Sequence, residues 1–372
     1  MQIGIDLTAC WRARVGMMTV AVELTRELLE QAEDDRLTLF CSRERPVDLE
    51  SANARFVLSP WRHEVLNKLR WMPAVEADAG LDAMLYPYWP SPPRRRPGAP
   101  PAAVFVHDLA FRVRPDEVPW QQRAYLGSVL PSALRQAAAV ITPSEATRRD
   151  LLEHYPVPGL AERLHVVPEG RSLDRFEPGP LPDGLTPGCF LLAVGTVEPR
   201  KNYPRLLQAY RRLKDRGLSM PLVVVGRVGW AYGRALDDLR GEPGVRLLGH
   251  VDDATLRTLY RSAAALAFPS LHEGFGLPLL EAFAEGLPAV AGASGALPEL
   301  AGEAALLVDP LDHLAIADAL ERAVTDQELR ARLSAAGRER AAAYTWQAAA
   351  GAVLGILETL PGGGRGEPRP YH

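Results

Sequence analysis

Short apolar segments alternate with amphipathic helical segments along nearly the whole chain. Alternation of this kind predicts parallel sheets covered by helices on both faces. In the first half, the apolar runs that predict strands lie at residues 3–7, 37–42, 55–59, 83–87, 103–108 and 139–144. Helical patterns lie at 20–31, 63–77, 120–138 and 145–154, and Ser144 stands where it can cap the last of these helices.

The alternation breaks once, near the middle of the chain. Residues 170–188 are rich in Pro, Gly and Asp, which disfavour long helices and central strands. Strand patterns resume at 190–195, 222–226, 245–251, 265–270, 288–292 and 305–309, with helical patterns at 203–216, 231–240, 254–262 and 278–285. The length of 372 residues exceeds the roughly 250–300 at which one core stops growing. We therefore predict domains at 1–172 and 189–344, a linker at 173–188 and a flexible tail at 361–372.

Composition and charge argue against several classes of function. The net charge is −4 and the pI about 6.1, which disfavours nucleic acid as a partner. The three cysteines, Cys10, Cys41 and Cys189, lack metal-ligand spacing. Cys41 and Cys189 lie in or beside apolar runs, so we expect buried free thiols in a reducing compartment. No run approaches the ~20 apolar residues of a membrane span, and residues 1–10 do not resemble a secretion signal. We expect a cytoplasmic protein.

A pair of cations stands between a strand and a helix in the second half. In the stretch FLLAVGTVEPRKNY, Arg200 and Lys201 directly precede the predicted helix at 203–216. A helix N-terminus presents unpaired amides and partial positive charge, so two adjacent cations there predict a phosphate site. The alternative is that both are solvated loop charges.

Two glutamates flank the start of the predicted helix at 278–285. Glycines in the loop let the amides around Phe275, Gly276 and Leu277 approach a ligand closely. The carboxylates of Glu273 and Glu281 can each accept hydrogen bonds from two vicinal hydroxyls. Alternatively both are surface charges, but Glu281 has apolar neighbours in the sequence, and a carboxylate in such company needs a partner.

His107 follows the apolar run AVFV, at the expected carboxyl end of a strand. Ligands of α/β sheets bind at this end of the strands, which favours a functional role over a structural one.

In order and spacing, these motifs resemble the retaining glycosyltransferases of family 4, which have the GT-B fold. That family carries a Gly…Arg-Lys segment and a Glu-x7-Glu signature, matched here by Gly195, Arg200, Lys201, Glu273 and Glu281. The resemblance extends to 106–117, 140–152 and 294–312, and covers nearly the whole chain.

The resemblance implies a role for each matched residue. Arg200 and Lys201 would bind the donor diphosphate and neutralise the leaving nucleotide. Glu281 would hold the ribose hydroxyls, while Glu273 and the amides near Phe275, Gly276 and Leu277 would orient the transferred sugar. His107 would reach that sugar from the other domain. The family requires no metal, so neither a metal site nor a cofactor is expected.

The resemblance also implies an architecture. Two Rossmann-like α/β domains with parallel sheets would face each other across a cleft, and the apolar run at 345–360 would cross back to the first domain. Cleft closure at the linker would bring His107 toward Arg200 and Lys201. The first loop of the family is Gly-rich, with amides near the donor; here Gly16 is present, but Met18 replaces the second glycine.

We therefore expect retaining transfer of a hexose or deoxyhexose from a nucleotide sugar to a hydroxyl acceptor. The segments VHDLAF and VVVGRVGW resemble bacterial mannosyl- and rhamnosyltransferase-like members, so GDP-mannose is the first donor considered, with UDP- and dTDP-sugars open. Alternatives are a nucleotide-sugar epimerase of the same fold, or a homologue that binds donor without transferring it, as Met18 suggests. A dehydrogenase would need a G-x-G-x-x-G motif that is absent.

Two segments raise the question of membrane contact. Trp61, Val65, Leu69 and Met72 share one face of an ideal helix within the basic, aromatic stretch 61–72. Such a helix either packs on its sheet or touches the inner face of a membrane. Among prolines, Arg94, Arg95 and Arg96 form either a solvated loop or part of an acceptor or membrane face.

Overall fold

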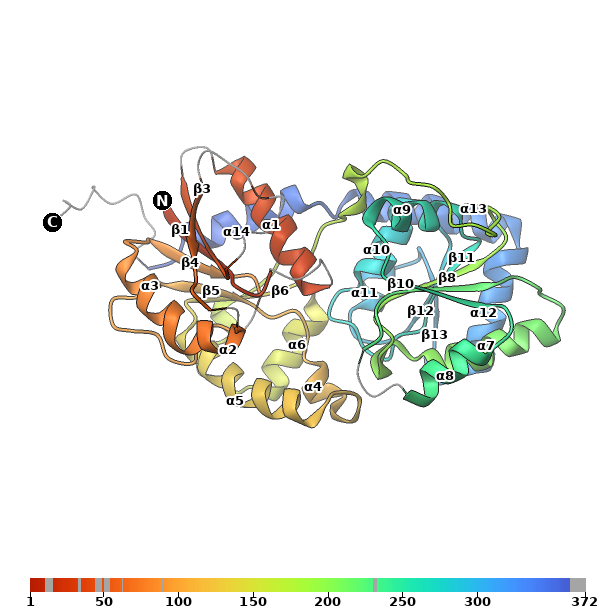
Figure 1. The fold of residues 1–372 in the computed structure, drawn as a ribbon, viewed down its shortest axis with the longest axis horizontal. Helices are drawn as coiled ribbons and strands as arrows, with labels where there is room; N and C mark the ends of the chain where they lie inside the picture. The colour runs from red at the N-terminus through yellow and green to blue at the C-terminus, as the bar shows by residue number, and fades with distance from the viewer. Residues whose placement is uncertain are drawn as a thin grey trace. The chain divides into compact units, whose positions relative to one another are not determined.

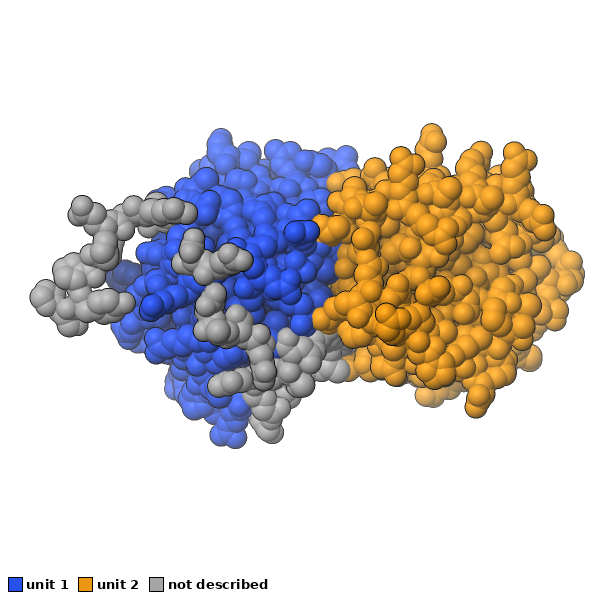
Figure 2. All heavy atoms as spheres, turned by 90° about the horizontal axis from the view of Figure 1, so that it is seen from above, with its two compact units in different colours: residues 1–109, 121–170, 346–372 blue, residues 110–120, 171–345 orange. Residues whose placement is uncertain are grey.

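The computed structural model describes residues 1–10, 16–32, 35–43, 49, 54–61, 63–88, 90–229 and 233–361. The chain forms two compact units (Figure 2). The first comprises Met1–Leu109, Gln121–Gly170 and Trp346–His372, and the second comprises Ala110–Trp120 and Arg171–Thr345. Each unit contains one parallel sheet, as the sequence predicts. Of the predicted tail at 361–372, all but Pro361 lies outside the described residues.

The first unit is built on a seven-stranded sheet whose recorded pairings are all parallel (Figure 1). The order β3-β2-β1-β4-β5-β6-β7 reverses between β1 and β4, and ligands of such sheets bind at the carboxyl ends beside the reversal. The bounds are β1 Gln2–Leu7, β2 Arg36–Cys41, β3 Ala54–Leu58, β4 Ala83–Tyr86, β5 Ala102–Phe105, β6 Ala139–Thr142 and β7 Leu164–Val166. The sequence predicts every one except β7, which has three residues.

Helices cover both faces of this sheet (Figure 1). They are α1 Met17–Gln31, α2 Glu64–Leu66, α3 Met72–Asp78, α5 Trp120–Gln136, α6 Glu145–His154 and α14 Trp346–Glu358. The predicted cap of α6 is confirmed, because Ser144 Oγ accepts a hydrogen bond of 3.1 Å from the Thr147 amide. The returning helix is also confirmed: α14 packs against α1, β4 and β5, and Gln31 Nε2 donates to the Gln347 carbonyl at 2.8 Å.

The second unit has a six-stranded parallel sheet in the order β10-β9-β8-β11-β12-β13. The strands are β8 Leu191–Val194, β9 Leu222–Val225, β10 Val245–Gly249, β11 Ala265–Phe268, β12 Ala289–Gly292 and β13 Leu306–Val308. The helices are α4 Ala110–Val113, α7 Tyr203–Asp215, α8 Gly233–Gly241, α9 Asp253–Ser262, α10 Leu277–Ala284, α11 Leu297–Ala301, α12 His313–Thr325 and α13 Gln327–Ala342.

Both faces of this sheet are buried, which explains why its strands are continuous apolar runs. On one face, Leu191 packs in a cluster with Leu206 of α7 and Ile316 of α12. On the other, Leu192 packs in a cluster with Leu280 of α10.

For residues 61–72, the alternative in which the apolar helical face packs on its sheet is wrong for Val65 and Leu69. Residues Asn67–Trp71 form a π-helix, whose wider turn shifts the direction of the following side chains. Lys68 is buried at 2% exposure and pairs with Asp6, whereas Val65 is 41% and Leu69 53% exposed. An ideal helical period therefore places the wrong residues inward, because the buried ion pair with β1 fixes the register here.

Two smaller expectations also change. Cys10 and Cys41 are buried as free thiols, but Cys189 is exposed, because it lies in a turn before β8 begins.

In the arginine run, Arg95 is held by Glu76, with Nε–Oε1 and Nη2–Oε2 distances of 3.0 Å. Arg94 and Arg96 are exposed, so the run divides into one structural arginine and two surface ones.

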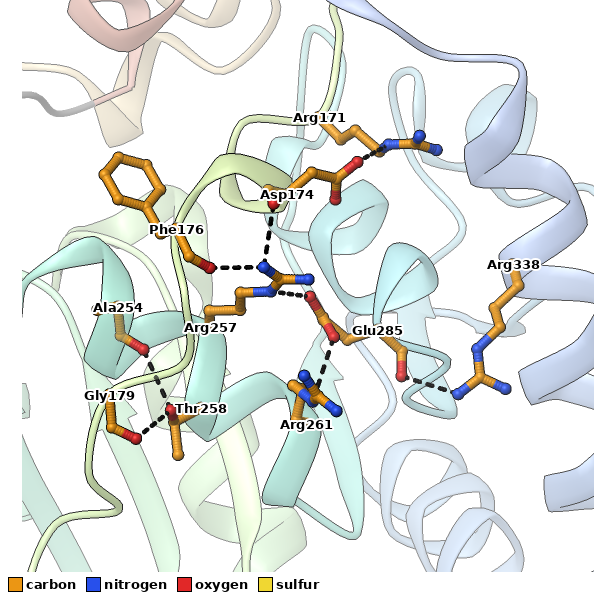
Figure 3. Close-up of polar contacts among 10 residues, drawn as sticks. All are labelled: Arg171, Asp174, Phe176, Gly179, Ala254, Arg257, Thr258, Arg261, Glu285 and Arg338. Atoms are coloured by element: carbon orange, nitrogen blue, oxygen red, sulfur yellow. Dashed lines mark hydrogen bonds and ion pairs between the residues drawn. The ribbon is translucent and has the colours of Figure 1, made fainter.

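Residues of the predicted linker form hydrogen bonds with the second unit (Figure 3). Arg257 Nη1 donates to the carbonyl oxygens of Asp174 at 3.0 Å and Phe176 at 2.5 Å. Its Nε lies 2.6 Å from Glu285 Oε1, at the end of α10. The boundary between the compact units falls after Gly170, so residues 173–188 belong to the second unit.

Candidate active site

A left-handed residue fixes the turn that carries Arg200 and Lys201. Both lie in the 3-10 turn Pro199–Lys201, and Asn202 then caps α7 with φ of 60°. Asn202 is 1% exposed, and its Nδ2 donates to the carbonyls of Pro269 at 2.9 Å and Pro310 at 2.6 Å. Asparagine adopts this backbone conformation more readily than most residues. The sequence reasoning missed this residue, although an Asn directly before a helix is a recognisable signal.

Gly195 brings the end of β8 against Lys201. A Cβ on Gly195 would lie 3.0 Å from Lys201 Cε, and its φ of 148° is rarely adopted by other residues. The Gly195 carbonyl accepts a 2.8 Å hydrogen bond from the Tyr203 hydroxyl. The aliphatic part of the Lys201 side chain therefore packs against the backbone of Gly195. Lys201 Nζ lies 4.9 Å from the centre of the Phe268 ring.

Glu273 joins the two cations. Lys201 Nζ lies 2.6 Å from Glu273 Oε1, and Arg200 Nη1 lies 2.7 Å from Oε2. Burial would raise the pKa of Glu273, but the charges of Arg200 and Lys201 outweigh burial and lower the pKa from 4.5 to about 2. The carboxylate is therefore ionised throughout the physiological range.

A second glutamate holds the other side of Arg200. Glu198 is 5% exposed, and its Oε1 lies 2.9 Å from Arg200 Nη2. Arg200 Nη1 also donates to the His272 carbonyl at 3.1 Å. The sequence reasoning missed Glu198, since one more acid in a loop is no signal until its partner is known. Together Glu198 and Glu273 fix the plane of the guanidinium.

The loop between the two glutamates leads into α10. Gly276 caps this helix with φ of 110°, and a Cβ there would lie 2.7 Å from Leu297 Cδ2. Phe275 is 6% exposed, and its ring meets that of Tyr344 edge to face, with centroids 5.8 Å apart. The backbone of Phe275, Gly276 and Leu277 is thus held where α10 begins, which suits a negatively charged ligand.

Glu281 lies beside Tyr260 of α9. Burial raises the pKa of Glu281 from 4.5 to about 8, the Tyr260 hydroxyl lowers it in part, and Asp253 adds a further rise. Burial and then Glu281 raise the pKa of Tyr260 well above 10. The buried Tyr260 hydroxyl forms no hydrogen bond of normal geometry with any described residue. Tyr260 and Glu281 thus lie close enough for each to affect the pKa of the other.

His107 lies in the first unit, just beyond β5, and is 4% exposed. Its Nδ1 lies 3.1 Å from Glu169 Oε1 and its Nε2 lies 2.8 Å from the Pro87 carbonyl. Its ring stacks on Phe105, with centroids 4.6 Å apart. Glu169 is a further residue that the sequence reasoning missed.

Gly16 begins α1, also in the first unit, with φ of 52°. A Cβ there would meet nothing within 4 Å. Most of the preceding loop, residues 11–15, lies outside the described residues, whereas Met18 forms part of the first turn of α1. The structure thus brings together Arg200, Lys201 and Glu273 in the second unit, and places Gly16 and His107 in the first.

In the described ranges, no group of three or more His, Cys, Asp or Glu side chains is arranged to hold a metal ion. No helix in the described part of the chain has the length and apolar content needed to span a membrane.

Comparisons with known proteins agree with this arrangement. The family model "Glycosyl transferases group 1" matches residues 187–340, and "Glycosyltransferase Family 4" matches residues 15–175. O-antigen chain mannosyltransferase B of Escherichia coli is 32% identical over 66% of this chain and 67% of its own length. MMP alpha-(1->4)-mannosyltransferase of Mycolicibacterium hassiacum is 34% identical over 60% of this chain, but only 54% of its own length is matched.

Solved structures of low sequence identity share the fold. Sucrose-phosphate synthase of Thermosynechococcus elongatus has a TM-score of 0.74 at 21% identity, covering 96% of this chain and 98% of that one. HepE of Anabaena, solved with UDP and glucose, has a TM-score of 0.72 at 17% identity, covering 96% and 99%. With its two parallel-sheet units and its returning helix, this chain belongs to the group 1, family 4 glycosyltransferases and has the GT-B fold.

Proposed function

We propose that this enzyme transfers a hexose or deoxyhexose from a nucleotide sugar to a hydroxyl acceptor, with retention of the anomeric configuration. The observation that carries the proposal is the cluster in which Arg200 and Lys201 share Glu273. GDP-mannose is the first donor to test, because two relatives are named mannosyltransferases. UDP- and dTDP-sugars follow, since HepE was solved with UDP and glucose.

In this proposal the donor diphosphate replaces Glu273 as the binding partner of Arg200 and Lys201. Without ligand, Glu273 balances the charges of Arg200 and Lys201. A diphosphate at the start of α7 offers these cations several strong acceptors. Glu273 is then free to accept hydrogen bonds from sugar hydroxyls, while Glu198 keeps Arg200 in place.

The second glutamate and its loop would hold the rest of the donor. Since its pKa is about 8, Glu281 is largely protonated at pH 7. A protonated carboxyl both donates and accepts, which suits two vicinal ribose hydroxyls. It also adds no negative charge beside the diphosphate. The amides of Phe275, Gly276 and Leu277 would orient the phosphate and the sugar.

For the reaction, we propose a front-face displacement. The bond between the anomeric carbon and the phosphate oxygen breaks, and a bond from that carbon to the acceptor oxygen forms on the same face. The acceptor proton passes to the departing phosphate oxygen. Arg200 and Lys201 stabilise the charge that develops there, so we propose that neither a metal ion nor a cofactor takes part.

Gly16 and His107 belong to the acceptor-side domain, proposed at 1–172 with the helix at 345–360.

We place the protein in the cytoplasm, with peripheral contact at the inner face of the membrane. The exposed side chains that support this contact are Leu58, Val65, Leu66 and Leu69, which are 40–53% exposed; Arg70 on the same segment is also exposed. Apolar side chains beside a cation suit the surface of an anionic bilayer. Leu69→Asp should reduce co-sedimentation with anionic vesicles, and equal sedimentation of both proteins would contradict the contact.

Nucleotide binding tests the donor site. Thermal-shift titrations with GDP, UDP, dTDP and ADP, and with their sugars, are run without added metal and repeated with Mg²⁺. One nucleotide should stabilise the protein, and Arg200→Ala with Lys201→Ala should abolish the shift. Arg212→Ala is the matched control, because Arg212 is an exposed arginine of α7.

The bound donor is then incubated with candidate acceptors, and proton NMR of the product gives its anomeric configuration. A retained configuration supports the mechanism. Absence of any nucleotide-dependent shift would contradict the donor site. Conversion of the donor sugar without an acceptor would indicate an epimerase instead.

A further inference from the structure

The loop at residues 275–277 of the second unit needs packing from its surroundings to keep one shape. Phe275 stands between Gly274 and Gly276, and glycine gives the backbone more freedom than any other residue does. A Cβ on Gly276 would lie 2.7 Å from Leu297 Cδ2 and 3.3 Å from Leu300 Cδ2, so the loop packs directly against α11 on one side. Amides that bind a ligand must be held within about 0.5 Å of the productive geometry. Side chains that fix this loop therefore affect what it can bind.

The ring of Tyr344 packs against Phe275 in the same loop. The ring centroids lie 5.8 Å apart with an angle of 64° between the planes, which is the edge-to-face arrangement that aromatic pairs favour. Tyr344 lies just beyond the end of α13. Its carbonyl accepts a 3.4 Å hydrogen bond from the Arg171 amide, and Arg171 Nη1 donates to the Ala341 carbonyl at 3.0 Å. The backbone that carries the Tyr344 ring is therefore itself held in place.

Arg340 joins Tyr344 to α11. Its Cζ lies 5.6 Å from the centre of the Tyr344 ring, within the range of a cation–π contact. Its Nε donates to the Leu300 carbonyl at 3.0 Å and its Nη2 to the Glu299 carbonyl at 2.6 Å. Carbonyls in the last turn of a helix lack partners within the helix and favour a cation. One guanidinium thus contacts both structures that pack against the loop.

A close approach of two helices determines where Arg340 lies. α13 packs against α10, and a Cβ on Gly337 of α13 would lie 3.1 Å from Phe283 Cδ1 of α10. Arg340 follows Gly337 by three residues and so lies on the same face of α13. Because α10 begins directly after Gly276, the face of α13 that contacts α10 also carries the side chain that reaches α11.

We propose that Arg340 and Tyr344 are positioning residues of the donor site, which hold the amides of residues 275–277 in the binding geometry before the donor arrives. The inference rests on the proposed function, because that function assigns these amides to the phosphate and the sugar. Both side chains act through the loop and not by contact with the donor. If they are removed, only a fraction of the molecules keeps the loop in place, and the apparent affinity for the donor falls by that fraction.

Calorimetry with the nucleotide that stabilises the parent protein tests the proposal. Tyr344→Leu removes the aromatic contact and should weaken nucleotide binding about 3- to 10-fold. Tyr344→Phe keeps the ring and should bind as the parent protein does. Arg340→Ala should also weaken binding, and adding it to Tyr344→Leu should cost less than the sum of the two losses, because the two side chains hold the same loop. Arg332→Ala, at an exposed arginine of α13, is the matched control.

Hydrogen exchange of the ligand-free protein reads the loop directly. The amides of Leu279 and Leu280 donate to the Gly276 carbonyl at 2.9 and 3.2 Å, so their exchange reports whether the loop is in place. Exchange of both should be faster in Tyr344→Leu and Arg340→Ala, and unchanged in Tyr344→Phe and Arg332→Ala.

Turnover gives a third readout, since loss of positioning should raise KM for the nucleotide sugar while kcat at saturating donor changes little. Unchanged nucleotide affinity in Tyr344→Leu would overturn the proposal, as would an equal loss in Tyr344→Phe. If the parent protein binds no nucleotide, the proposed function fails, while the exchange of the Leu279 and Leu280 amides still decides whether Arg340 and Tyr344 hold the loop.

Discussion

Glu273→Gln tests the electrostatics of the cation cluster. The substitution keeps the size of the side chain but removes the charge that Arg200 and Lys201 share. Lowering the pKa of Glu273 from 4.5 to about 2 corresponds to about 3 kcal/mol of folding stability, at roughly 1.4 kcal/mol per unit of pH. Arg200 is 20% exposed, so water screens part of this interaction, and we expect a loss of about 2 kcal/mol at pH 7.

The sign of the pH dependence follows from the direction of the shift. Because the pKa is lower in the folded protein, the stabilisation is present above pH 4.5 and is lost as the pH falls toward 2. By pH 3, less than about half of it remains. Glu273→Gln should therefore be less stable than the parent protein at pH 7, and the difference should narrow at pH 3.

Urea unfolding followed by circular dichroism at pH 7 and pH 3 measures these differences. Hydrogen exchange at pH 7 then shows whether the loss lies in β11 and α10 of the second unit. Glu303→Gln serves as the control, because it makes the same change at an exposed position of this unit. Equal stability of Glu273→Gln and the parent protein at pH 7, or an undiminished difference at pH 3, would refute the reasoning.

Three further substitutions test other parts of the structure. Asn202→Ala should lower the free energy of unfolding by about 3 kcal/mol, through lost hydrogen bonds and a positive φ; Asn202→Gly should lose less in urea titrations, because glycine tolerates this φ. Glu281→Gln should stabilise the ligand-free protein at pH 8 but not at pH 4.5, because burial raises the pKa of Glu281 to about 8; urea titrations at the two pH values measure this difference, and a pH-independent effect would contradict this explanation. Lys68→Met should lower stability by about 3–5 kcal/mol, because Asp6 is left unpaired in the core. Adding Asp6→Asn should recover much of that loss, and no recovery would mean that packing and not charge dominates.

Much of this molecule follows from local sequence pattern. Apolar runs predict every strand except β7; most of these strands are buried on both faces and need a continuous apolar segment whatever their neighbours are. The helix at Glu145–His154 and its Ser144 cap follow for a similar reason, since a cap satisfies amides only three residues away. The positions of Arg200, Lys201, Glu273 and Glu281 follow from motif order and spacing.

Contacts between distant residues were decided by the tertiary structure. Lys68 lies off the apolar face of an ideal helix over 61–72, yet it is buried in a π-helical turn, where it pairs with Asp6 of β1. The contact between Glu169 and His107 could not be recognised from the sequence, because 62 residues separate them. The exposure of Cys189 likewise depends on where β8 begins. A pattern read along the chain reports which residues favour burial, but a charged side chain is buried only where a partner meets it, and only the folded chain brings that partner near.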